Sequence, residues 1–283
     1  MNAVSTTGAS PRSARLGRNL RSAILVGVGL GIVIIASLVF VRQAFVGVVA
    51  VCVAVASWEL ATALRGGGQY RVALPVLLVG GQAIVWLSWP YGTTAVLAAF
   101  MVTVLAMLIW RMPGGADGYL RDVSASLFAV AYVPLFATFA ALLVLPEDGV
   151  GRVLSFMICV VASDIGGYIF GVLLGRRPLA PAISPKKSWE GLFGSLLFGT
   201  VAGALTVMWL LDAPWPLGAV LGALLVVVAT LGDLIESLIK RDVGIKDMGN
   251  LLPGHGGLMD RMDSMLPSAV VSWLLLSLFV PVR

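Results

Sequence analysis

The stretch SLIKRDVGIKDMGNLLPGHGGLMDRMD, from Ser237 to Asp263, holds four aspartates, four basic side chains and His255, the only histidine of the chain. Charged residues make up just 12% of the whole sequence, and long apolar runs stand on both sides of this stretch. Solubility gives no reason to concentrate charge between two apolar runs. We therefore expect a polar functional site between two membrane helices.

The composition places most of the chain in lipid. Hydrophobic residues account for 59% of the sequence, and the mean hydropathy is +0.99, well above that of soluble globular domains. A net charge of +5 also occurs in nucleic-acid-binding proteins, but here the cations flank apolar runs, as topology-determining charges do. The composition therefore predicts an all-α, polytopic integral membrane protein whose partner is the lipid bilayer and not a nucleic acid.

Nine apolar segments have the length that a helix needs to cross a bilayer, about 20 residues. They are residues 22–41, 44–64, 72–89, 92–110, 123–145, 153–175, 191–211, 216–236 and 265–281. Residues 1–21 are rich in Ser, Thr, Ala and Arg, which predicts a disordered basic arm. The apolar run after this arm is too long for the core of a signal peptide, so we expect it to be the first membrane helix.

The distribution of cations fixes the expected orientation. With the N-terminus in the cytoplasm, 16 of the 19 Lys and Arg residues fall on the cytoplasmic side and three, Arg42, Arg152 and Arg283, on the other. This asymmetry follows the positive-inside rule. We therefore predict a multi-pass protein of the cell membrane with a cytoplasmic arm and a cytoplasmic active site. Its N-terminal transmembrane helices occupy 22–145 and its catalytic transmembrane region 146–283.

Three acids lie where a membrane helix does not normally carry charge. Asp164 is near the middle of its predicted span. Asp233 and Glu236 stand three residues apart, on one face of the helix that leads into the charged stretch. A carboxylate in a membrane is costly unless it faces a polar cavity or a partner, so Asp164 is a candidate site residue. For the other two, an ordinary helix-end ion pair stays an alternative.

A second polar segment, SPKKSWEG from Ser184 to Gly191, joins the sixth and seventh spans. Its two adjacent lysines are either topology signals or charge compensation for a bound polyphosphate. Its tryptophan suits the membrane interface, an acyl chain or a base. The candidate substrate-binding residues of this segment are Ser184, Lys186, Lys187, Trp189 and Glu190.

The charged stretch ends on two aspartates three residues apart, Asp260 and Asp263, which can point the same way. Helix capping is the alternative, since acids are favoured at helix N-termini. Carboxylates without soft ligands favour Mg²⁺ over zinc. The sequence contains no P-loop and no dinucleotide-binding motif. Together the residues predict metal-assisted phosphoryl or nucleotidyl transfer at the cytoplasmic face.

The charged stretch closely resembles the signature of the phosphatidate cytidylyltransferases, or CDP-diacylglycerol synthases. In that signature a serine is followed at fixed spacing by Lys-Arg, Lys-Asp, His-Gly-Gly, Asp-Arg and a last Asp. This chain carries it without a gap as Ser237, Lys240, Arg241, Lys246, Asp247, His255, Gly256, Gly257, Asp260, Arg261 and Asp263. The SPKKSWEG, SDIGGY and GDLIES segments are similar to the family as well, so the likeness covers roughly residues 150–270.

The resemblance implies a membrane enzyme, often a homodimer, that converts CTP and phosphatidate into CDP-diacylglycerol and pyrophosphate. It also implies a requirement for Mg²⁺, with K⁺ beside it. We expect Asp233, Asp260 and Asp263 to hold the metal, with Asp164 as a further candidate. The expected catalytic residues are Asp233, Lys240, Arg241, Lys246, Asp247, His255, Asp260, Arg261 and Asp263, and Glu236 and Ser237 join the substrate-binding set.

Two other functions would use similar residues. A related CTP-dependent lipid transferase or polyprenol kinase would share the metal and the lysines. An ion-coupled transporter would need acids spread along the spans and reachable from both faces, whereas the dense charge here lies on one side. Among the bases, we expect Lys240 and Arg241 to act on the reacting phosphates, and Lys186 and Lys187 mainly to bind substrate.

Overall fold

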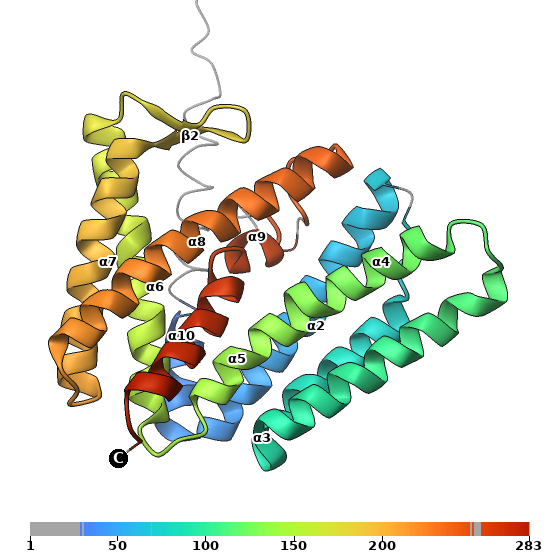
Figure 1. Cartoon of the computed structure of the whole chain (residues 1–283), viewed down its shortest axis with the longest axis horizontal. Coiled ribbons are helices and arrows are strands. Elements are labelled where there is room, and N and C mark those ends of the chain that lie inside the picture. The colour runs from blue at the N-terminus through green and yellow to red at the C-terminus, as the bar shows by residue number, and fades with distance from the viewer. Residues whose placement is uncertain (1–28, 30, 69, 250, 252–255, 283) are drawn as a thin grey trace, which may run out of the picture.

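The structure is a computed structural model that describes residue 29 and residues 31–68, 70–249, 251 and 256–282 (Figure 1). These residues are almost entirely helical, apart from a small β-hairpin and short connections. The all-α prediction is therefore confirmed for this part of the chain. The predicted basic arm, 1–21, and His255 fall outside the described residues.

The N-terminal half is a set of helices that follow a short apolar helix over Gly31–Phe40. Its elements are α2 (Arg42–Gly68), α3 (Leu74–Arg111), the 3₁₀ turn η1 (Met112–Gly114), α4 (Tyr119–Val130), the π-helical turn η2 (Ala131–Leu135) and α5 (Phe136–Leu143). The π-helical turn contains Pro134, which cannot donate a backbone hydrogen bond. The widened turn absorbs this loss, and α4 and α5 run on as one rod.

Helix α3 reverses its direction at Gly92, where the backbone has φ 62° and ψ −149°. Pro90 just before it removes a helical hydrogen bond, and glycine adopts the positive φ without strain. The two halves pack closely against each other. A Cβ added to Gly80 in the first half would lie only 2.2 Å from Cγ2 of Thr103 in the second half. Figure 1 shows the reversal beside the label α3. Each half is about 27 Å long, enough to cross a bilayer, so α3 contains the third and fourth predicted spans.

The C-terminal half carries the charged segments. Its elements are α6 (Gly149–Leu174), β1 (Pro178–Ala180), β2 (Ser184–Ser188), α7 (Trp189–Leu210), α8 (Trp215–Val243), α9 (Met259–Met262) and α10 (Met265–Phe279). The two strands pair antiparallel and lie at the ends of α6 and α7, while α8 crosses these helices obliquely (Figure 1). The hairpin and the C-terminal end of α8 therefore meet at one end of the molecule.

Glycines let α7 and α8 pack backbone to backbone. Gly203 and Gly218 face each other, and a Cβ on either would lie 2.2 Å from the carbonyl oxygen of the other. A Cβ on Gly222 would lie 2.0 Å from the carbonyl oxygen of Gly199. Small residues allow such close approach of membrane helices. The charged end of α8 is therefore carried by a frame with little freedom to shift.

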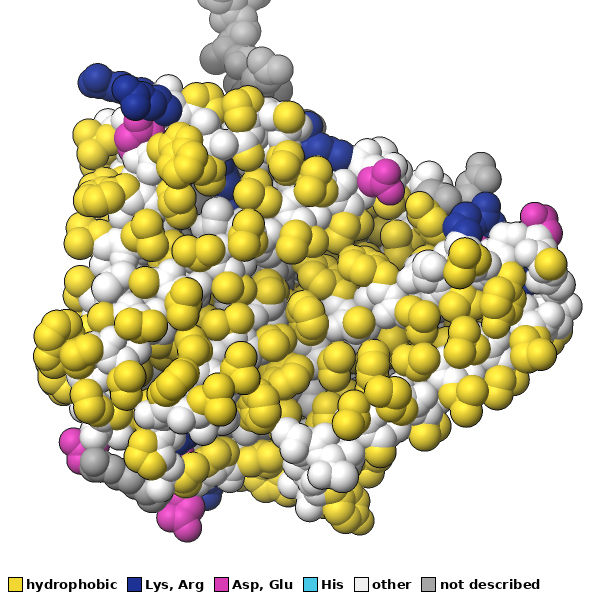
Figure 2. Space-filling view, viewed as in Figure 1, with side chains coloured by type: hydrophobic (Ala, Val, Ile, Leu, Met, Phe, Trp, Pro, Cys, Tyr) yellow, Lys and Arg dark blue, Asp and Glu magenta, His cyan; other side chains and the backbone are white. Residues whose placement is uncertain are grey.

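Seven helices in the described part of the chain are long and apolar enough to cross a membrane. The reversed helix α3 counts once among them, so eight of the nine predicted spans lie on these seven helices. The remaining span, 22–41, lies partly outside the described residues, and Gly31–Phe40 is its described portion. The flanks of the molecule are mostly hydrophobic (Figure 2). The prediction of a polytopic membrane protein is confirmed, with nine as an approximate count of spans.

Candidate active site

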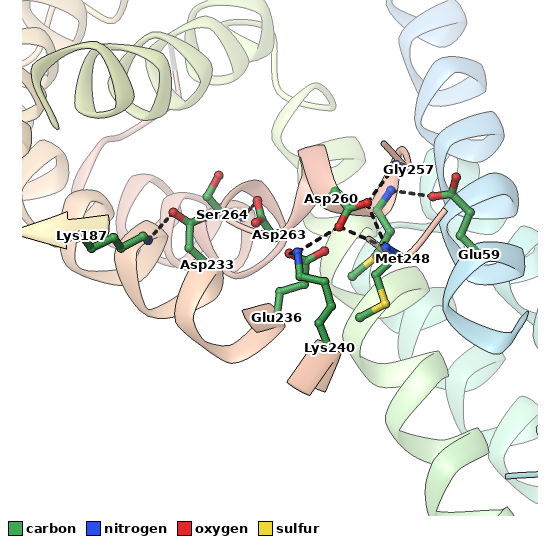
Figure 3. A network of polar contacts seen from close by, with 11 residues as sticks. Glu59, Lys187, Asp233, Glu236, Lys240, Met248, Gly257, Asp260, Asp263 and Ser264 are labelled. Carbon is green, nitrogen blue, oxygen red and sulfur yellow. Dashed lines mark hydrogen bonds and ion pairs between the residues drawn. The ribbon is translucent and has the colours of Figure 1, made fainter. Parts of the chain in front are cut away.

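Helix α8 places three charged side chains on one face near its C-terminal end. Asp233, Glu236 and Lys240 follow one another at helical spacing, and Lys240 Nζ lies 2.6 Å from Glu236 Oε2 (Figure 3). Glu236 is only 1% exposed, and a buried carboxylate without a cation would be strongly destabilising. The pair is more than an ordinary helix-end contact, because Lys240 Nζ also lies 2.9 Å from Asp260 Oδ1.

Asp260 gathers the loop that follows α8. Its Oδ2 accepts hydrogen bonds from the backbone N–H groups of Met248 at 3.0 Å and Gly257 at 2.9 Å. The close approach requires glycine at position 257, since a Cβ there would lie 3.0 Å from the Asp260 carboxylate and 2.8 Å from the Gly249 nitrogen. Together with Lys240, these contacts fold the predicted motif back onto α8.

Three carboxylates, Asp233, Glu236 and Asp263, form what we call the carboxylate cluster. Asp263 interacts electrostatically with the other two. The backbone at Asp263 also lies close to that of α8, since a Cβ added to Gly232 would be 2.5 Å from the Asp263 carbonyl oxygen. Glu236 Oε1 is buried and has no hydrogen-bond partner among the described residues. An all-oxygen set with an unpartnered buried atom fits a hard cation such as Mg²⁺.

The side chains do not, as they stand, form a ready-made metal centre. Within the described ranges, no three His, Cys, Asp or Glu side chains are gathered closely enough to hold a metal ion together. Two members of the cluster make ion pairs with lysines instead. Lys187 pairs with Asp233, and Lys240 pairs with Glu236. The cluster therefore supplies the donor atoms for a cation, and its coordination geometry stays a prediction.

The β-hairpin brings its lysines to the same place. Lys187 makes an ion pair with Asp233, and both line a cavity of about 190 Å³ between the hairpin, α6, α7 and α8. Lys186 and Asp164 line this cavity too. Asp164 also interacts electrostatically with Lys187 and Arg261. The structure thus gathers Asp164, the two hairpin lysines and Asp233 of α8 around one polar cavity, which we call the catalytic cavity.

Two predicted substrate-binding residues lie on the outer side of the hairpin. Trp189 is 57% exposed and lines a surface hollow apart from the catalytic cavity. Glu190 accepts hydrogen bonds from the backbone N–H groups of Arg176 at 3.1 Å and Arg177 at 3.3 Å. Glu190 therefore closes the base of the hairpin, and a contact of either residue with substrate stays a prediction.

The remaining predicted residues lie at the same end of the molecule. Arg241 ties α8 to the hairpin, because its Nη1 donates a hydrogen bond to the carbonyl oxygen of Ala182 at 2.6 Å. Ser184 pairs with Ala180 at the turn end of the hairpin. The others are half-buried or exposed on α8, on α9 and in the connection between them: Ser237, Lys246, Asp247 and Arg261.

One acid in the N-terminal half was missed by the sequence reasoning. Glu59 of α2 is 1% exposed, and its Oε2 accepts a hydrogen bond from the Met259 N–H at 2.8 Å (Figure 3). A Cβ on Gly249 would lie 2.2 Å from the other carboxylate oxygen. Glu59 thus holds the start of α9, the helix that carries Asp260. A signal for it existed, since a glutamate in the apolar run AVASWELATAL is unusual.

Comparisons with known proteins show similarity along nearly the whole chain. The model described as "Cytidylyltransferase family" matches residues 21–279. A phosphatidate cytidylyltransferase of Mycobacterium bovis is 51% identical over 94% of this chain and 91% of its own length. One of Mycobacterium leprae is 53% identical over 93% of this chain and 89% of its own.

A more distant relative shows the same similarity across both halves. The phosphatidate cytidylyltransferase of Pseudomonas aeruginosa is 36% identical over 78% of this chain and 82% of its own length. The match of the family model likewise runs from the start of the first predicted span to the end of α10. Nearly the whole chain, and not only the charged stretch, takes part in these similarities, and it therefore belongs to the cytidylyltransferase family.

Proposed function

We propose that this chain transfers CMP from CTP to phosphatidate, yielding CDP-diacylglycerol and pyrophosphate for phospholipid biosynthesis. Its family and the names of its relatives support this activity. The structural observation that carries it is the ion pair between Lys187 of the hairpin and Asp233 of α8. This pair joins cations suited to phosphates and carboxylates suited to a metal at one polar cavity.

The reaction joins two anions, and the lysines address that difficulty. An oxygen of the phosphatidate phosphate forms a bond to the α-phosphorus of CTP, and the bond from that phosphorus to the bridging β-phosphate oxygen breaks. The electron pair leaves with pyrophosphate. The attacking oxygen is already anionic at neutral pH, so no strong base is required. Lys186, Lys187 and Lys240 offset the repulsion between the phosphates and hold them in place.

We propose that the carboxylate cluster holds Mg²⁺, since it offers only oxygen donors and one of them, Glu236 Oε1, is buried without a partner among the described residues. The metal, when bound, supplies stabilisation of the negative charge on the α-phosphate and on the leaving group. Asp260 and Asp164 stay predicted ligands, although Asp260 also holds the loop after α8. A K⁺ ion beside Mg²⁺ is proposed from the resemblance alone.

The active site is proposed to face the cytoplasm from the cell membrane, as the distribution of cations favours. A reporter inserted after Gly249 is then expected in the cytoplasm, and one fused after residue 283 on the opposite side. Finding both reporters on one side would contradict this topology. A homodimer is proposed from the resemblance, and light scattering of the purified protein in detergent would measure its mass.

Two labels in CTP test the proposed activity. Purified protein is incubated with phosphatidate, Mg²⁺ and CTP labelled either in cytidine or at the γ-phosphate. The cytidine label is expected in the chloroform-soluble product, and the γ label in pyrophosphate. A γ label in the lipid would instead reveal a kinase. If folded protein places neither label in lipid while a verified family member does so in parallel, the proposed activity is wrong.

A further inference from the structure

A second polar cavity lies in the N-terminal half. It has a volume of about 640 Å³ and opens where α2 and α3 end and α4 begins. We call it the arginine pocket, after the four arginines that line it: Arg65, Arg71, Arg111 and Arg121. It shares no lining residue with the catalytic cavity. The reaction proposed above gives these arginines no task.

A buried aspartate fixes two of the four arginines. Asp122 has 0% exposure, and it accepts hydrogen bonds from Arg111 Nε at 2.9 Å and from Arg121 Nε at 3.1 Å. It also accepts the backbone N–H of Arg71 at 3.1 Å. Arg111 Nη2 also donates to the carbonyl oxygen of Asp117 at 2.8 Å, and binding of Asp122 through Nε leaves the remaining terminal guanidinium nitrogens for other acceptors. Asp122 thus works as an internal anchor that holds the arginines around the cavity.

The charge of the arginine pocket is not balanced. Among the described residues, Arg65 donates only to the carbonyl oxygen of Val72, at 2.7 Å. The Arg71 side chain is exposed and makes no hydrogen bond or ion pair within the part of the chain that the structure describes. Four cations therefore surround one contacting carboxylate, that of Asp122. Topology signals need cations near a membrane surface, but they do not need them gathered at one cavity around a buried anchor.

The arginine pocket opens at the same end of the molecule as the active site. The C-terminal end of α2 contacts the C-terminal end of α8. A Cβ added to Gly67 would lie only 2.0 Å from the Val243 carbonyl oxygen. Trp110, which is 56% exposed, and Tyr70 line the pocket, and such aromatic side chains favour the level of lipid headgroups. Figure 2 shows Lys and Arg side chains over the ends of α2 and α4, above hydrophobic flanks.

We propose that the arginine pocket binds the phosphate group of an anionic lipid headgroup, with the acyl chains along the hydrophobic flanks. The planar fork of a guanidinium matches phosphate oxygens in pairs. Basic pockets between the ends of membrane helices are suited to anionic headgroups. This binding is separate from the reaction and does not depend on the proposed activity.

Lipid retention tests the proposal. The variant Arg65→Gln/Arg71→Gln removes two cations whose side chains do not hold Asp122. Its matched control, Arg176→Gln/Arg177→Gln, removes the same charge beside the β-hairpin, outside the arginine pocket. Each protein is reconstituted in nanodiscs of phosphatidylcholine and phosphatidylglycerol and examined by native mass spectrometry. The pocket variant is expected to bind phosphatidylglycerol about tenfold more weakly or worse, and the control within about twofold of wild type.

Two further arms identify the source of the phosphate. Protein in phosphatidylcholine alone is titrated with short-chain phosphatidylglycerol or with inorganic phosphate, and its thermal unfolding is followed. Stabilisation by the lipid alone, lost in the pocket variant, supports the headgroup site. Equal stabilisation by inorganic phosphate would replace the lipid by a soluble anion and overturn that part of the proposal.

Equal phosphatidylglycerol retention by wild type, pocket variant and control would overturn the proposal as a whole. Should the double variant fail to fold, Arg71→Gln decides by the same measurements, because the Arg71 side chain makes no contact that the described fold needs.

Discussion

The arginine pocket and the carboxylate cluster are built from the same kinds of side chain in opposite proportions. In the pocket, the single carboxylate of Asp122 holds two of four arginines. Around the cluster, two lysine amines are shared among three carboxylates, those of Asp233, Glu236 and Asp260, and Asp263 adds a fourth. Ionisable groups persist in a membrane protein when they neutralise one another or meet a ligand. From these proportions we propose an anionic ligand for the pocket and a cation for the cluster.

The two sites also differ in what carries them. The arginine pocket is formed by helix ends and connections, around residues 70–72 and 110–121. Two of the three members of the carboxylate cluster, Asp233 and Glu236, stand on α8, which packs on α7 through glycine backbones such as Gly203 and Gly218. Metal-assisted chemistry loses rate with displacements on the order of 1 Å, whereas a bound headgroup tolerates more. The closely packed helices α7 and α8 thus support the site that tolerates the smaller displacement, the carboxylate cluster.

Asp263→Ala is expected to have the largest effect on chemistry and none of the usual cost in stability. Transfer should fall by about 1,000-fold, the consequence of losing a metal ligand. The melting temperature should change little, because the hydrogen bond that Asp263 accepts from the Ser264 N–H at 2.7 Å is local to the start of α10. Activity with both substrates saturating and thermal unfolding are measured together, with the exposed Asp117→Ala as the matched control. More than a tenth of wild-type activity would exclude Asp263 from the metal site.

Asp122→Ala is expected to show the reverse pattern. Removing the anchor leaves Arg111 and Arg121 without their carboxylate, and breaking a buried ion pair costs about 3 kcal/mol. The melting temperature should drop clearly, while kcat per folded molecule should stay within about threefold of wild type. A large loss of kcat with unchanged stability would show that the arginine pocket serves the reaction directly, and would break the separation of the two sites.

The hairpin lysines are expected to differ from each other. Lys187 contacts Asp233, whereas Lys186 lines the catalytic cavity without an ion pair among the described residues. Lys187→Ala should therefore lower kcat by about tenfold or more, and Lys186→Ala should mainly raise KM for one substrate. Steady-state kinetics in detergent micelles, with CTP and phosphatidate both varied, separate the two parameters. Equal changes of KM with unchanged kcat in both variants would return Lys187 to the purely binding role expected from the sequence.

The smallest effect is expected at the link between the two halves. Glu59→Gln keeps an oxygen that can accept the Met259 N–H, so kcat should fall by less than about threefold. Glu59→Ala removes the acceptor and should lower kcat by about tenfold, the value of one hydrogen bond to a charged group. Steady-state kinetics of both variants, normalised to the amount of folded protein, show whether kcat is lower in Glu59→Ala than in Glu59→Gln. Identical values for Gln and Ala would show that the hydrogen bond does not position the loop.

Much of the C-terminal half could be predicted from local sequence patterns. The i, i+3 spacing of Asp233 and Glu236 placed both on one face of a helix, and the length of the apolar runs predicted the spans that correspond to α6, α7 and α8. The choice of Asp164 as a candidate site residue followed from the cost of an unpartnered charge in lipid, and Asp164 lines the catalytic cavity. These predictions rest on rules that act within one helix or between a helix and its solvent.

Contacts between distant segments could not be predicted in this way. Lys186 and Lys187 are adjacent in sequence. The way in which the hairpin lies against α8 decides which of them reaches Asp233. The arginine pocket depends on the reversal of α3 at Gly92 and on a connection that returns Asp122 to Arg111. Glu59 contacts Met259, the first residue of α9, which lies 200 residues later in the chain. No rule that acts within one helix predicts such a contact.

That last contact has a consequence for how the protein is made. A ribosome adds about 5–20 residues per second, so the partner of Glu59 is synthesised on the order of ten to forty seconds after Glu59 itself. Until Met259 emerges, α2 resides in the membrane with an acid whose final hydrogen bond does not yet exist. The active centre is thus closed last, by the final helices, and a chain truncated before α9 carries most of its membrane spans but no completed site. Such a nascent chain carries an acid without its final hydrogen bond, and unfinished molecules differ from finished ones in this respect.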